Sequence, residues 1–288
     1  MMKIDKKEYA TLQEYGFRDF RHLKKVLKVL NVIGLILVIG IMYLSIAVIF
    51  IQSVNSSSDV TSFGNFTFKW YGEIFQHRSL RRAITNTFVV SIVTTIIATI
   101  VGTFVAIGIH SLEKKKKQRI MLVNNIPILN ADIVTGISLM LIFSLVLPIF
   151  PYIFGPVTLV VAHLFFTLPY VILSVLPKLR EVDTNLMDAA LDLGVKPYKA
   201  LLKVVIPSIS AGIFAGMLMS FTMSLDDFVI SYFNTGNGFD NLSIWIYGSI
   251  GRRSLTPAVY AFSSLLTIVT LAALVGFNFL QSKRKVKK

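Results

Sequence analysis

Six long apolar runs alternate with short polar segments along this chain. They are approximately residues 29–52, 83–110, 120–148, 156–177, 208–232 and 256–281. An α-helix rising about 1.5 Å per residue needs about 20 apolar residues to cross a hydrocarbon layer roughly 30 Å thick. Each run therefore predicts one transmembrane helix. The expected fold is an all-α domain over 29–281, between a basic N-terminal segment (1–28) and a basic tail (282–288).

The amino-acid composition also indicates an integral membrane protein. Hydrophobic residues make up 54% of the chain and the mean hydropathy is +0.69, which is outside the range typical of soluble domains. There is no cysteine, and the four histidines (His22, His77, His110 and His163) are scattered along the sequence. Neither a disulfide framework nor a metal site is predicted.

The distribution of lysine and arginine predicts the orientation of the spans. The segments 1–28, 111–119, 178–207 and 282–288 hold 23 of these residues, and the segments 53–82, 149–155 and 233–255 hold 6. Basic loops stay in the cytoplasm, so both termini are predicted to lie inside. The net charge of +14 is then explained by topology, and no nucleic-acid partner is predicted. The run LEKKKKQR at 112–119 is interpreted as a cytoplasmic stop, not as a lipid-specific site.

The cytoplasmic segment 178–207 has a helical pattern. Polar positions recur on one face and apolar positions on the other: Glu181, Asn185, Asp188 and Asp192 against Val182, Leu186, Ala190 and Leu193. Gly194 is placed to end this helix and Pro197 to begin another. An acidic stripe suits a negatively charged membrane surface poorly, so the helix is expected to contact a protein partner.

The stretch DAALDLGVKPYKALLKVVIP at 188–207 resembles the EAA signature of binding-protein-dependent ABC importer permeases. Asp188, Ala189, Ala190 and Gly194 are in register, and Pro207 closes the pattern. The departures are Asp for Glu at 188, and Val and Ile for Ile and Leu at 204 and 206. FTFKWYGEIF at 66–75 and SFTMSLDDFVISYF at 220–233 further resemble the spermidine/putrescine group of these permeases. The resemblance covers roughly 63–281.

The resemblance implies a type I ABC importer permease of six helices, in the cytoplasmic membrane of a bacterium. It implies three kinds of protein partner: two copies of an ATPase subunit, a second permease, and an extracytoplasmic polyamine-binding protein. The EAA residues Asp188, Ala189, Ala190, Gly194 and Pro207 would couple the spans to the ATPase. The sequence has no G-x-x-x-x-G-K-[ST] loop, so the chain is predicted not to be an enzyme. It would bind no cofactor itself, and the partner ATPase would use ATP and Mg.

Two adjacent acids, Asp226 and Asp227, interrupt the apolar fifth run. An intramembrane acid costs roughly 2.5–3.5 kcal/mol on insertion scales and needs a partner or a function. In one straight helix entering near residue 208, the pair would lie about 27 Å along the span, with side chains about 100° apart. We expect one to face the substrate path, with Phe228 and Tyr232 supplying cation–π contacts, and the other to pair with a neighbouring span. The alternative is a structural pair bonded to Ser, Thr or backbone groups.

A further acid, Asp132, follows Pro127 in the third run, and Pro127 is expected to kink that helix. If the span enters the membrane near residue 120, Asp132 lies about 18 Å in at 1.5 Å per residue, close to the midplane. A place on the substrate path and a structural role are equally compatible with this position.

Other functions stay open. A permease of the same class could carry iron, an opine or another organic cation, because the EAA segment concerns the ATPase and not the solute. An ion-coupled secondary carrier also needs intramembrane acids, but such carriers are built from internal repeats that this sequence does not show. A scaffold or membrane enzyme has the least support, because no nucleophile–base arrangement is evident.

Overall fold

The computed structural model describes residues 6–57, 59, 62–236, 238–251 and 256–286. Within these ranges the chain is built of helices, with one isolated β-bridge between Asn55 and Phe66. It divides into two compact units, residues 1–74 with 256–288 and residues 75–255. The predicted basic ends and the segment 233–255 lie partly outside the described residues.

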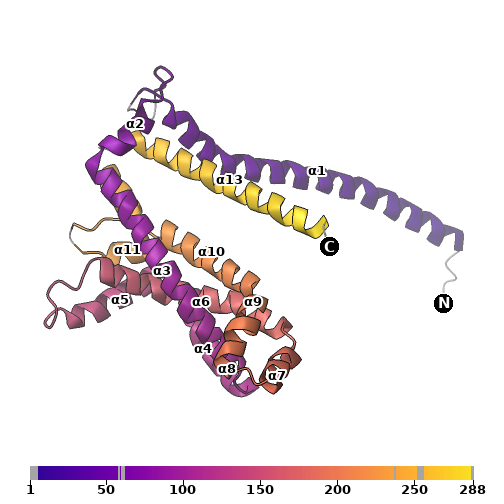
Figure 1. Cartoon of the computed structure of the whole chain (residues 1–288). Coiled ribbons are helices and arrows are strands. Elements are labelled where there is room, and N and C mark those ends of the chain that lie inside the picture. The colour runs from indigo at the N-terminus through magenta and orange to yellow at the C-terminus, as the bar shows by residue number, and fades with distance from the viewer. Residues whose placement is uncertain (1–5, 58, 60–61, 237, 252–255, 287–288) are drawn as a thin grey trace. The chain divides into compact units, whose positions relative to one another are not determined.

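The first unit pairs the two ends of the chain. It contains α1 (Lys6–Ser53), most of α2 (Lys69–Gln76) and α13 (Ala258–Val286), and α1 and α13 run side by side (Figure 1). The Tyr71 hydroxyl lies 2.9 Å from Ser264 Oγ, and Trp70 Nε1 donates to the Asn55 carbonyl at 2.6 Å. These bonds attach α2 both to the loop after α1 and to α13.

The second unit holds the remaining helices. They are α3 (Arg78–His110), α4 (Lys114–Leu129), α5 (Asp132–Val146), α6 (Pro156–Glu181), α7 (Thr184–Asp192), α8 (Pro197–Ala200), a π-helix (Leu201–Val205), α9 (Ile206–Ser208), α10 (Ser210–Asp226), α11 (Val229–Asn234) and α12 (Leu242–Gly251). The core forms where α3, α6 and α10 pack together. A second apolar cluster joins α5 and α6 to α11 through Leu139, Phe166 and Ile230.

Small residues let the three core helices approach closely. A Cβ on Gly102 of α3 would lie 2.8 Å from Val171 Cγ1, and a Cβ on Gly216 of α10 would lie 3.0 Å from Val171 Cα. Val171 of α6 is fully buried. Without hydrophobic force between helices in lipid, such close van der Waals contact is a main source of association.

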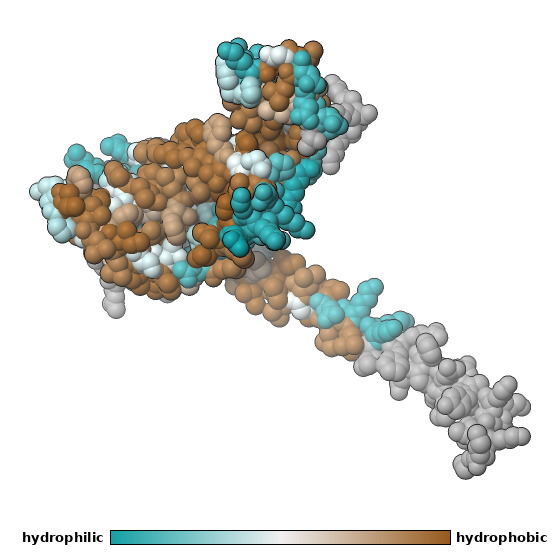
Figure 2. Space-filling view, turned by 90° about the horizontal axis from the view of Figure 1, so that it is seen from below, coloured by the Kyte–Doolittle hydropathy of each residue, from teal (hydrophilic) through white to brown (hydrophobic). Residues whose placement is uncertain are grey.

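Apolar side chains also cover the outside of the helices. On α3, Ile92, Ile96 and Ile100 are exposed while Ala98 and Ala106 are buried. Apolar residues cover most of the coloured surface seen in Figure 2. A helix that is apolar all round is typical of a membrane span, where the outer face contacts lipid or a partner helix.

Three helical segments are each long and apolar enough to cross a membrane: Lys24–Ser53, Arg78–His110 and Pro156–Glu181. They correspond to the first, second and fourth predicted spans. In the sixth predicted span, α13 has an apolar helical part, Ala258–Ala272. The predicted count of six, the orientation and the domain boundaries stay predictions.

The kink expected at Pro127 of the third span and the continuous helix expected for the fifth span are both wrong. α4 and α5 meet at 103°, and the break falls at Asn130 and Ala131, whose backbones are extended, not at Pro127 inside α4. The helix up to α9 meets α10 at 72°, which falls at the start of the predicted fifth span, and that span is interrupted at Asp227. The estimate that put Asp132 18 Å into a straight span therefore does not hold. Asp132 is exposed in the first turn of α5.

Candidate functional site

The two acids of the fifth span stand at an interruption of the helix. Asp226 is the last residue of α10, Asp227 has an extended backbone (φ −66°, ψ 129°), and α11 begins at Val229. The expectation that both lie in one continuous helix is wrong, because the chain leaves the helical conformation between them. Within a membrane, the backbone groups freed by such a break need partners.

Asp227 supplies partners at this break. Its carboxylate accepts hydrogen bonds from the backbone N–H groups of Ser231, at 2.7 Å, and Ile230, at 3.3 Å. These are donors of the first turn of α11, which have no partner inside the helix. Asn241 Nδ2 donates to the Asp227 carbonyl at 3.3 Å. The Asp227 carboxylate thus caps the N-terminus of α11.

His163 of α6 pairs with Asp227. Its Nε2 lies 3.5 Å from Asp227 Oδ2 and 2.9 Å from Ser231 Oγ, and its Nδ1 lies 2.6 Å from Ser224 Oγ. The side chains of His163 and Asp227 are 1% and 8% exposed. We call these four residues, His163, Ser224, Asp227 and Ser231, the His163 network. It connects α6 to both sides of the break, and through it Asp227 contacts a neighbouring helix.

Asp226 has the opposite surroundings, since it is exposed. An aromatic cluster follows it, formed by Phe228, Tyr232 and Tyr247. The ring centroids are 5.6 Å apart for Phe228 and Tyr232, 5.0 Å for Phe228 and Tyr247, and 5.7 Å for Tyr232 and Tyr247. Tyr232 is 48% and Tyr247 55% exposed, so the cluster is accessible from outside the protein.

Tyr247 comes from α12, which is held beside the break by polar contacts. Asn241 caps this helix by accepting from the N–H of Ile244 at 2.9 Å. The N–H of Leu242 donates to Thr87 Oγ1 of α3 at 2.8 Å. Asn241 and Thr87 are buried. One polar residue, Asn241, therefore links the interruption of the fifth span to the helix that carries Tyr247.

Sequence reasoning missed His163, Asn241 and Tyr247. His163 was considered only as a metal ligand and set aside, although a lone histidine in an apolar span is itself a signal, because an intramembrane polar group needs a partner. Asn241 and Tyr247 lie in a segment that was expected to be only an outward loop. Asp132 is not among the residues that contact the His163 network.

The segment 178–207, predicted to be cytoplasmic, forms the expected helix, glycine turn and helix. Asp183 caps α7 by accepting from the N–H of Asn185 at 3.0 Å. At the other end, Gly194 has φ +74°, its N–H donates to the Leu191 carbonyl at 2.9 Å, and the N–H of Val195 donates to the Ala190 carbonyl at 3.1 Å. This is a Schellman motif, in which the left-handed conformation favours glycine.

The motif residues of this segment are largely open to the outside. Asp188, Ala189, Gly194 and Pro207 are exposed and Ala190 is half-buried. Leu193, beside the turn, is 84% exposed, and Tyr198 is 57% exposed. The surface of the turn thus combines a fixed backbone with accessible apolar side chains.

The match to a family model covers more than half of the chain. Residues 120–286 match the family described as "Binding-protein-dependent transport system inner membrane component". The chain belongs to this family. It is therefore an integral membrane component of a transport system. The expected all-α fold of a type I importer permease is confirmed.

Curated relatives match over most of the sequence. The chain is 30% identical over 234 residues to the spermidine/putrescine transport system permease protein PotC of Haemophilus influenzae, covering 81% of this chain and 89% of that protein. It is 28% identical over 235 residues to PotC of Escherichia coli K12, covering 82% and 87%. It is 30% identical over 239 residues to the putrescine transport system permease protein PotI of Escherichia coli K12, covering 82% and 84%.

A solved structure has the same fold. It is a chain of a bacterial ABC transporter involved in the import of the acidic polysaccharide alginate, with a TM-score of 0.62 and 14% identity. The match covers 92% of this chain and 99% of that chain.

Proposed function

We propose that this chain is the permease subunit of an ATP-driven importer of polyamines such as spermidine and putrescine. The observation that carries the proposal is the similarity over most of the chain to PotC and PotI, whose names give these solutes. Polyamines are flexible chains of ammonium groups. A protein that moves them needs accessible carboxylates and aromatic faces that bind cations weakly enough to release them.

Asp226 and the aromatic cluster supply this chemistry. The acid is exposed and stands two residues before Phe228, and the tyrosine rings of the cluster are about half exposed. A cation over an aromatic face gains about 0.5–1 kcal/mol at exposed sites, which suits a transient contact. Asp227 does not itself face outward. Its carboxylate is held in the His163 network and fixes the start of α11, which carries Tyr232. Asp132 stays a second candidate for the path.

Uptake measurements test the solute. In cells carrying the whole transporter, unlabelled spermidine and putrescine should compete with labelled spermidine, while iron complexes, opines and unrelated cations should not. Competition by one of the latter alone would assign a different cargo. In vesicles depleted of ATP, uptake should cease even when a proton gradient is imposed, and uptake driven by the gradient would instead indicate a secondary carrier.

The Asp226→Asn variant tests the site. The loss of the exposed carboxylate should lower polyamine uptake at least tenfold while assembly with the ATPase stays at the wild-type level, since a charge contact worth about 1.4 kcal/mol is a factor of ten. Asp240→Asn is the matched control, because Asp240 is also exposed but lies outside α10, α11 and α12. Wild-type uptake by Asp226→Asn, or equal losses in both variants, would contradict the assignment.

For the assembly, we expect two copies of an ATPase subunit, a second, PotB-like permease, and an extracytoplasmic polyamine-binding protein, in the cytoplasmic membrane of a bacterium. The family description names dependence on a binding protein, which supports the last of these partners. ATP and Mg would be used by the ATPase. The exposed Leu193 and Tyr198 near the Gly194 turn support docking of that subunit on the EAA segment, because exposed apolar side chains are common at protein interfaces.

A further inference from the structure

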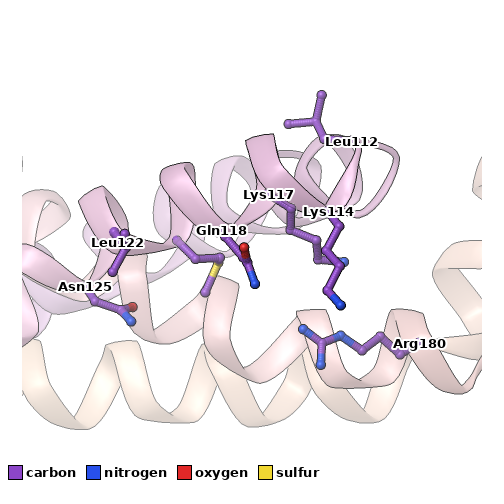
Figure 3. A pocket seen from close by; sticks show the side chains of 8 residues that line it. Leu112, Lys114, Lys117, Gln118, Leu122, Asn125 and Arg180 are labelled. Carbon is purple, nitrogen blue, oxygen red and sulfur yellow. The ribbon is translucent and has the colours of Figure 1, made fainter.

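A pocket of about 810 Å³ lies between the start of α4 and the end of α6. Lys114, Lys117, Gln118 and Asn125 line it from α4, and Arg180 lines it from α6. In Figure 3, Lys114 and Lys117 extend toward the helix that carries Arg180. Three cations from two helices therefore meet at one cavity, which the basic run in the sequence did not predict because Arg180 is 63 residues from Lys117.

The positive charge of this pocket has no counter-charge among the described residues that line it. The nearby acids pair elsewhere: Glu113 with Lys116 at 3.7 Å, and Glu181 with Lys178 at 2.7 Å. Lys117 lies in the predicted cytoplasmic segment 111–119, where burial and then the charge of Arg180 lower its pKa. Like charges so placed disfavour one another's charged form, and a bound anion removes that cost.

An apolar surface continues from the pocket along α4. Leu122 lines the pocket and is 71% exposed, and Val123, Ile126 and Leu129 further along are 66%, 57% and 85% exposed. Leu122, Ile126 and Leu129 recur at helical spacing, so beyond the cations α4 exposes an apolar stripe, although Asn124 and Asn125 lie on the same helix. This polarity, with the charge on the side predicted to be cytoplasmic, matches a phospholipid with its headgroup at the cations and an acyl chain along α4.

We propose that Lys114, Lys117 and Arg180 form a binding site for the phosphate headgroup of an anionic phospholipid of the inner leaflet. Arg180 presents a planar fork that matches phosphate oxygens, and the two lysines add point charges. Gln118 and Asn125 carry amide donors on the same face of α4 as the lysines. The site joins α4, which begins the bent third span, to the end of α6, three residues before the EAA helix α7. It is independent of the cargo.

The test measures lipid bound to the purified, assembled transporter. Native mass spectrometry compares retention of cardiolipin and phosphatidylglycerol with that of phosphatidylcholine, for wild type and for the Lys117→Gln and Arg180→Gln variants. A cation near a membrane surface contributes about fivefold to the binding of an anionic lipid. Each variant should therefore lose about fivefold in retention of anionic lipid, with no change for phosphatidylcholine. Lys115→Gln is the control, because Lys115 is on the same helix and does not line the pocket.

Four results would overturn the proposal. One is an equal loss in Lys115→Gln, which would make the effect one of net charge. A second is displacement of the lipid by millimolar inorganic phosphate, which would make the ligand a free anion. A third is unchanged lipid retention with loss of the ATPase from the complex, which would assign the cations to an acidic protein surface. A fourth is that both pocket variants lose all lipids and also fail to assemble, which would give the three cations a role in folding.

Discussion

Replacing His163 by phenylalanine tests whether the interruption of the fifth span depends on a buried charge pair. Phenylalanine fills the position with a slightly larger ring, so no cavity is left, and the added volume can cost some overpacking. The substitution removes the 2.6 Å and 2.9 Å contacts to Ser224 and Ser231, and it leaves the Asp227 carboxylate, 8% exposed, without its partner on α6.

The size of the effect distinguishes two states of the pair. Hydrogen bonds between membrane helices contribute about 0.6 kcal/mol each on average, so loss of the serine contacts alone costs about 1 kcal/mol. Removal of one member of a buried ion pair costs about 3–5 kcal/mol, because the other charge is left unpaired. An ionic pair therefore predicts the larger value, and a neutral hydrogen-bonded contact predicts the smaller one. The added substitution Asp227→Asn should then recover about 2 kcal/mol or more, because it removes the unpaired charge.

The assay is equilibrium unfolding of the reconstituted transporter with increasing mole fraction of a denaturing detergent. His77→Ala, at an exposed histidine, serves as the control and should change the free energy of unfolding by less than about 0.5 kcal/mol. A cost below about 1 kcal/mol for His163→Phe, with no recovery on adding Asp227→Asn, would refute the ionic pair and leave a neutral hydrogen-bonded contact.

Two further predictions concern glycines. Gly194→Leu should lower co-purification of the ATPase and transport-linked ATP hydrolysis, because φ +74° costs a side chain with a Cβ about 1–2 kcal/mol, whereas Gly194→Asn should retain both. No atom lies within 4 Å of a Cβ added at Gly194, so a steric clash is not expected. If Gly194→Asn also lost the ATPase and ATP hydrolysis, the conformational explanation would be contradicted. Gly216→Leu should destabilise the core by about 1–3 kcal/mol in a thermal unfolding measurement, because its Cβ meets Val171 at 3.0 Å. Gly108→Leu, with open space around it, should not, and equal losses would refute the packing argument.

Local patterns predicted local structure well. The helix, glycine turn and helix of the EAA segment followed from the amphipathic spacing and from Gly194, because both the cap and the turn depend on neighbours in sequence. The apolar runs located the helices of the first, second and fourth spans for the same reason. The role of Asp188 and its neighbours in ATPase docking stays a prediction.

Features that depend on distant parts of the chain could not be predicted. Nothing in the residues near Asp227 indicates that a histidine 64 positions earlier will meet it. The extended backbone at Asn130 and Ala131 has no Gly or Pro to mark it, so the sequence pointed to Pro127 instead. The basic run at 114–117 was interpreted as a topological signal, and only the approach of Arg180 across the fold makes it a pocket.

The helix α10 connects the end of the EAA segment to the interruption at Asp226 and Asp227. Only Ile209 separates α10 from α9, which holds the end of the EAA signature at Pro207, and α10 ends at Asp226. Its 17 residues give a length of about 25 Å at 1.5 Å per residue. A rod this short transmits an axial push almost undiminished, since only the 72° bend at its base and the break after Asp226 can absorb motion. If the ATPase docks on the EAA segment as proposed, its motion would reach the aromatic cluster through α10 without any change in the helix itself.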